Sequence, residues 1–159
     1  DSPDQAKALL ADLEAQVRER LGDWIYGADE ETLGRAVLSL LTERKKRFAV
    51  IEKGMEGAII KALTAQGKSF VGGEVMNADV KSKPLPELTA QYAREVFADV
   101  VLGAELRTTE NKHEVEIAIL GLEREHKFSF SYGGQTKQAA DWAASLALSI
   151  LRRELLKQS

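Results

Sequence analysis

The stretch that decides the fold is F-A-V-I-E-K-G-M-E-G, residues 48–57. Its first four residues, Phe48–Ile51, form a short apolar run of the kind that fills a buried strand. Gly54 and Gly57 then supply the backbone freedom that a tight turn needs, and the helical pattern of residues 58–66 follows directly. The stretch therefore predicts a strand, a tight turn and a helix, which form a typical unit of an α/β fold.

Elements of both kinds surround this unit. Apolar residues recur at helical spacing near both ends of the chain, and they alternate with polar residues in the stretches that precede the last helix. The further predicted helices cover residues 2–21, 29–47, 86–98 and 135–156, and the further predicted strands lie at 69–77, from 100 onward, at 114–119 and at 127–132. Residues 108–112 are predicted as a polar turn, and Leu88, Tyr92, Val96 and Phe97 as one buried helix face.

Strands separated by helices, followed by a hairpin through residues 122–124 and a final helix, predict a three-layer α/β/α sandwich. Its mixed sheet has roughly five strands and an N-terminal helix precedes it. Residues 1–28 would form that helix and a connecting segment, and residues 29–159 the α/β domain. Ligands of such sheets bind at the carboxyl ends of strands, so the turn after Ile51 is the first place to look.

Composition excludes several classes of protein. The 159 residues suffice for one core, and a net charge of -3 gives no broad positive field for nucleic acid. There are no cysteines, which excludes disulfides and thiolate chemistry. No apolar run approaches the roughly 20 residues of a membrane span. We expect a cytoplasmic domain without a cofactor, nucleic-acid partner or membrane partner, and the start at Asp1 suggests a piece of a longer protein.

Four short stretches carry a resemblance to a known family. R-L-G-D-W-I-Y-G at residues 20–27 is the most specific, and residues 48–57 fall where the family carries A-E-S-x-T-G-G. Residues 70–77 are similar to its strand F-x-x-G-x-V-x-Y-S-N, and residues 132–135 to an aromatic-P-G-D-R turn. Over nearly the whole chain the sequence thus resembles the C-terminal domain of the competence/damage-inducible protein CinA, a family that acts as nicotinamide-nucleotide amidases. The resemblance implies an upstream domain of the molybdopterin-binding type.

The departures from the family motifs coincide with its catalytic groups. The family's serine nucleophile falls on Lys53, its tyrosine on Asn77 and its next serine on Ala78, while Lys81 lies one residue short of the family's following lysine. A glycine-rich loop of the family is replaced by the short polar connection at residues 107–112. A lysine amine that attacked an amide would leave a stable new amide. The resemblance therefore predicts that no residue keeps the amidase role.

The predicted ligand pocket is built from the residues that fall on these motifs. It comprises Glu52, Lys53, Gly57, Asn77, Lys81 and Gly134. The alternative is that Glu52, Lys53 and Glu56 are solvated charges of a turn, which charged turn residues commonly are. No ligand spacing indicates a metal site, and His113 and His126 are expected as exposed strand residues.

The sequence leaves three functional hypotheses. The first is a CinA C-terminal-like domain without amidase activity, serving as a binding, regulatory or dimerisation module of a larger protein, with a nucleotide-like small molecule as its ligand. The second is a remodelled nicotinamide-nucleotide amidase, or a hydrolase of related amides, with a changed active site. The third is a homo-oligomeric structural piece, for which the N-terminal helices and the closing helix would supply the interface.

Overall fold

The structure, a computed structural model, describes residues 30–63, 69–110, 112–123, 125–133 and 136–158. The predicted segment 1–28 and the predicted pocket residue Gly134 lie outside the described residues. In chain order the elements are α2 (Glu30–Glu43), β1 (Phe48–Lys53), α3 (Ala58–Leu63), β2 (Phe70–Met76), α4 (Leu85–Val96), β3 (Val100–Thr109), β4 (Lys112–Leu120), β5 (His126–Gly133) and α5 (Thr136–Leu156).

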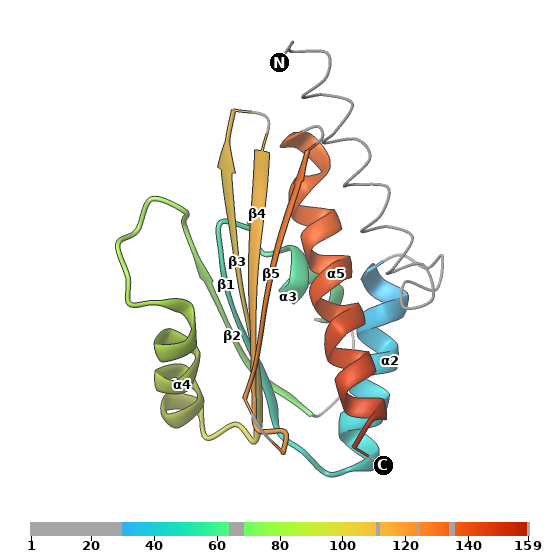
Figure 1. Cartoon of the computed structure of the whole chain (residues 1–159). Helices are drawn as coiled ribbons and strands as arrows, with labels where there is room; N and C mark the ends of the chain where they lie inside the picture. Colours follow the sequence, from blue (N-terminus) through green and yellow to red (C-terminus); the bar gives the residue numbers. More distant parts are fainter. Residues whose placement is uncertain (1–29, 64–68, 111, 124, 134–135, 159) are drawn as a thin grey trace.

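The strands form one mixed sheet in the order β2-β1-β3-β4-β5. β1 pairs in parallel with β2 and β3, whereas β3–β4 and β4–β5 are antiparallel. Helix α4 covers one face, and α2, α3 and α5 cover the other, so the predicted three-layer sandwich is confirmed (Figure 1). The hairpin and the closing helix are also where the alternation and the helical spacing predict them.

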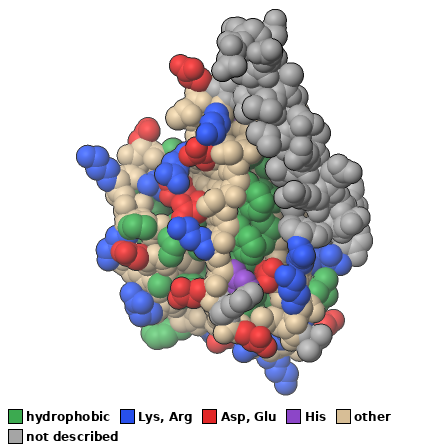
Figure 2. All heavy atoms as spheres, viewed as in Figure 1, with side chains coloured by type: hydrophobic (Ala, Val, Ile, Leu, Met, Phe, Trp, Pro, Cys, Tyr) green, Lys and Arg blue, Asp and Glu red, His purple; other side chains and the backbone are tan. Residues whose placement is uncertain are grey.

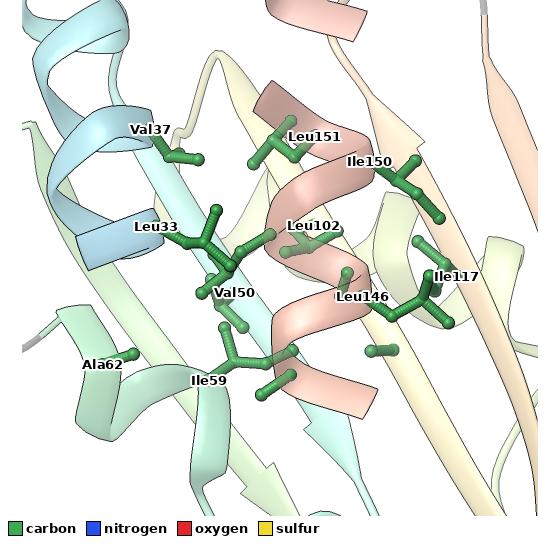
Figure 3. Close-up of a cluster of buried hydrophobic side chains, with 14 of the residues drawn as sticks. Leu33, Val37, Val50, Ile59, Ala62, Leu102, Ile117, Leu146, Ile150 and Leu151 are labelled. Atoms are coloured by element: carbon green, nitrogen blue, oxygen red, sulfur yellow. The ribbon is translucent and has the colours of Figure 1, made fainter. Parts of the chain in front are cut away.

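The main core lies between the sheet and the α2–α3–α5 layer. Leu33 and Val37 of α2 meet Leu146 and Leu151 of α5 over the central strands (Figure 3). Leu102 on β3 lies at the centre of this cluster and is completely buried. A smaller cluster, Ala49, Ile51, Tyr92 and Val101, fills the space under α4. Side chains of β1 therefore alternate between the two cores, as strand geometry requires.

Two sequence-based predictions are wrong in detail. Residues 108–112 are not all turn, because β3 extends to Thr109 and β4 starts at Lys112, with the two residues directly opposite each other. Phe97 is not buried but 79% exposed. It caps α4 in the left-handed conformation with φ 55°, which takes its side chain off the buried stripe of the helix.

None of the helices in the described ranges is long and apolar enough to cross a membrane.

Candidate functional site

The carboxyl end of β1 is held by a turn that requires glycine. Gly54 has φ +76°, and a Cβ atom there would collide with the backbone carbonyl of Leu106 on β3. Its N–H donates to the carbonyl oxygen of Met76 at 2.9 Å, which ties the end of β1 to the end of β2. Gly57, with φ +83°, leads directly into α3. The close approach of three chain segments makes this turn a rigid frame for the side chains of β1.

Glu52 is completely buried on the α3 side of the sheet. Its Oε2 accepts a hydrogen bond from the backbone N–H of Ile60 at 3.0 Å, whereas Oε1 has no partner among the described residues. Burial raises the pKa of this carboxyl above its ordinary value of 4.5, and the amides of residues 57–60 act in the opposite direction. Glu52 thus holds the first turn of α3, and the expectation of a solvated turn charge is wrong for it.

Glu52→Gln is expected to remove a pH dependence of stability. Because the pKa of Glu52 is raised in the folded chain, the native state keeps a proton that the unfolded chain loses above about pH 4.5. The contribution of this carboxyl to the free energy of unfolding therefore falls as the pH rises from about 4.5 to the folded-state pKa. The stability of the variant relative to wild type should grow over this pH interval and level off above it.

Urea unfolding at a series of pH values measures this difference. Glu56→Gln is the matched control, since Glu56 is exposed in the same turn and should follow the wild-type curve. Parallel curves for wild type and Glu52→Gln would contradict the role assigned to the buried carboxyl.

Lys53 lies on the other face of β1, toward α4, and is 8% exposed. Its Nζ donates to Ser82 Oγ at 3.0 Å, across 29 residues of sequence. Ser82 is its one hydrogen-bond partner among the described residues, although an ammonium group can donate three bonds. The solvated-charge alternative is wrong for Lys53 too, because β1 continues two residues past its apolar run between two flanking strands.

The remaining predicted pocket residues are only partly brought together. Gly57 is buried in the turn, while Asn77 and Lys81 are exposed in the connection from β2 to α4. Asn77 accepts a hydrogen bond from the N–H of Val80 through its carbonyl oxygen, so this connection begins with a tight turn. Ser82 joins the site although no motif in the sequence selects it. The one signal for it is the displacement of Lys81 by one residue from the family's lysine.

A charged ladder continues from Lys53 across the same face of the sheet. Glu105 on β3 lies between two partners, Lys53 on β1 and Glu116 on β4. Arg107 bridges the two carboxylates, with Nε 3.5 Å from Glu105 and Nη2 3.3 Å from Glu116. Lys127 Nζ lies 3.4 Å from Glu116. Each cation neutralises carboxylates that would otherwise repel across paired strands.

The two histidines lie inside the protein rather than on its surface, so the expectation of exposed strand residues is wrong. His113 is completely buried, and its Nδ1 lies 2.9 Å from Thr108 Oγ1. The side chain of His126 is 10% exposed, and its Nδ1 lies 3.5 Å from a carboxylate oxygen of Glu154 on α5. Both side chains lie on the face of the sheet that α5 covers, since α5 packs against β4 and its Glu154 meets His126 of β5. No group of three possible metal ligands occurs within the described ranges.

The relatives and the solved structures that resemble this chain carry similar descriptions, although no family model matches the chain. A competence-damage inducible protein of Caldicellulosiruptor bescii is 30% identical over 98% of the chain and 45% of its own length. A CinA-like protein of Deinococcus deserti is 29% identical over 99% of the chain and 43% of its own length. The chain thus spans less than half the length of these curated relatives.

Solved structures share the fold. The competence damage-inducible protein A of Klebsiella pneumoniae superposes with a TM-score of 0.69 at 15% identity, over 83% of this chain and all of that one (100%). A competence or damage-inducible protein from Enterobacter asburiae gives a TM-score of 0.67 at 16% identity, over 80% of this chain and 99% of the other. At such low identity the match concerns the arrangement of helices and strands alone.

Proposed function

From the premise that this chain is a CinA-family domain, we propose that it binds a nucleotide-like small molecule at the carboxyl end of β1 and has lost amidase chemistry. The chain spans less than half the length of its curated relatives, so the domain would serve as a binding or regulatory module within a longer protein. The observation that carries the proposal is the buried Lys53 at the position of the family's nucleophile.

Two features of the turn support the loss of hydrolysis. Neither Lys53 nor Ala78, which lies against the turn at Gly54, carries a hydroxyl group. The amides at the start of α3 are directed at the carboxylate of Glu52, so they are engaged by the protein itself. An amidase needs free donors for the oxyanion that forms on its substrate. At this turn the donors are already occupied.

The chemistry of the site indicates the class of ligand. Lys53 offers the unused donors of an ammonium group, and the exposed amide of Asn77 and hydroxyl of Ser82 lie in the connection that follows β2. Such a set suits a carboxylate or phosphate oxygen, because charge-assisted hydrogen bonds are the stronger ones. Nicotinic acid mononucleotide should therefore bind more tightly than nicotinamide mononucleotide.

Lys53→Met is expected to abolish the response to the ligand. The substitution keeps much of the length of the buried stem but removes the charge and its donors, and a ligand stabilises only the state that binds it. Thermal unfolding with increasing nicotinic acid mononucleotide should raise the melting temperature of wild type and leave that of the variant unchanged. Each protein is compared with its own ligand-free melting temperature.

Lys46→Met is the matched control, because Lys46 precedes β1 at its opposite end. It should keep the full wild-type shift. Equal shifts in wild type and Lys53→Met would contradict the placement of the ligand at Lys53.

One contact favours a second candidate function, a remodelled hydrolase. Ser82 Oγ lies 3.0 Å from Lys53 Nζ, and a lysine in its neutral form can take the proton of a serine hydroxyl. The serine oxygen would bond to the substrate carbonyl carbon, the proton would pass to the leaving amine, and water would then release the acid. Ammonia release from nicotinamide mononucleotide that disappears in Ser82→Ala would establish this function and overturn the loss of hydrolysis.

A further inference from the structure

The outer edge of β5 has no partner strand within the described ranges. The sheet order ends at β5, and its register with β4 runs without a shift from the Lys112–Gly133 pair to the Ile119–His126 pair. Alternate residues of this eight-residue strand therefore direct their backbone N–H and C=O groups to this edge. Exposed edges of this kind pair readily with another strand unless proline, bulges or several charges protect them. β5 contains neither proline nor a bulge, and Lys127 is its one lysine.

The two rows of side chains on β5 differ in polarity. Lys127, Ser129 and Ser131 are exposed on the α4 side, whereas Phe128 and Phe130 are half-buried against the main core. In the space-filling view hydrophobic side chains form a column near the middle of the molecule, and charged side chains gather to its left (Figure 2). A strand that paired with β5 would need the same division into a polar row and an aromatic row.

The sequence of β5 meets that need itself. If two copies pair antiparallel about Ser129, each Phe128 lies opposite the partner's Phe130, and Ser129 lies opposite the partner's Ser129. Aromatic cross-strand pairs stabilise such a ladder, whereas like charges directly opposite each other destabilise it. Lys127 faces the partner's Ser131, so this register places no two like charges directly opposite each other.

Charge also favours this register. Glu114 on β4 is 48% exposed and lies directly opposite Ser131 of its own chain. The partner's Lys127, opposite that serine, would therefore come next in the same row of side chains. A surface pocket of about 410 Å³ lined by Arg107, Glu114 and Ser131 borders this row. Lys127, which already lies 3.4 Å from Glu116 of its own chain, would thus approach a second carboxylate, and Glu114, which lies 3.3 Å from Lys112, a second cation.

We propose that two copies of this chain associate by antiparallel pairing of their β5 strands, in the register centred on Ser129, into one continuous sheet. This surface differs from the N-terminal helices and the closing helix, which the sequence offers as an oligomer interface. The association is independent of the proposed ligand, because Lys53 lies three strands away in the sheet.

Disulfide trapping tests the register directly, because the chain has no cysteine of its own. In Ser129→Cys the two introduced thiols face each other across the symmetry axis, within disulfide range. Mild oxidation should convert the protein to a covalent dimer that is visible on a non-reducing gel. Lys127→Cys on the same strand is the control, because its thiols would be about 13 Å apart along the ladder and should not link. Equal linking of the two variants, or linking of Lys127→Cys alone, would overturn the register.

Sedimentation velocity at increasing protein concentration tests the association itself. Wild type should sediment as a dimer, and Ser129→Glu, which sets two carboxylates opposite each other, should sediment as a monomer with an unchanged circular dichroism spectrum. Ser39→Glu, at an exposed position on α2, should remain dimeric. A wild-type monomer at every concentration, or a dimer in Ser129→Glu, would overturn the proposal.

Discussion

Gly54→Ala should lower the free energy of unfolding by about 3 kcal/mol. Part of the loss comes from the left-handed backbone at φ +76°, which costs an L-residue about 1–2 kcal/mol. The rest comes from the collision of the new methyl group with the Leu106 carbonyl, a backbone atom of the central strand that cannot move aside. The variant should also lose its response to the ligand, since the same turn positions Lys53.

Gly57→Ala separates these two causes. Gly57 has a similar φ of +83°, but the nearest atom to a Cβ there is 3.8 Å away, so only the backbone cost of about 1 kcal/mol remains. Urea unfolding of both variants gives the comparison. Equal losses would mean that the packing of the β1 turn against β3 is looser than the structure shows.

Leu102→Ala should lower the free energy of unfolding by about 3 kcal/mol or more. Leu102 is completely buried on β3, between the parallel and the antiparallel halves of the sheet. Side chains of α2 and α5 pack around Leu102 (Figure 3). Because these helices hold the surrounding side chains in place, the cavity left by the substitution stays open. Urea unfolding checks the value.

Leu156→Ala, at the exposed end of α5, removes the same atoms where the side chain is 45% exposed. Its loss should stay below about 1 kcal/mol. A loss at Leu102 no larger than this would contradict the position of the main core.

The sequence predicts those parts of the fold that depend on local patterns. Phe48–Ile51 and the glycines after it predict β1 and its turn, and the alternation of residues 127–132 predicts β5. These signals are local, because strand alternation and glycine turns are properties of neighbouring residues. The same reasoning fails for Phe97, where a single left-handed residue ends α4 and exposes an aromatic side chain.

The site is harder to predict, because its contacts join distant residues. The sequence suggests that Glu52 and Lys53 are solvated charges of a turn, yet both are buried. The reason is that β2 and β3 flank β1 beyond its apolar residues 48–51. The contact of Lys53 with Ser82 spans 29 residues and leaves no periodic signal. His113 is polar in the sequence and buried in the structure, where Thr108 on the neighbouring strand supplies its hydrogen bond. Burial of a polar residue depends on such partners, which no local pattern reveals.

Isothermal titration calorimetry with nicotinamide mononucleotide tests the central claim, because the same experiment detects both binding and turnover. A domain that binds without hydrolysis should give saturable heats that decay fully to the baseline after each injection, and Lys53→Met should give none. A sustained heat flow after each injection would show turnover and contradict the loss of amidase chemistry. The absence of any heat with wild type, together with an unchanged melting temperature, would contradict the proposed binding site.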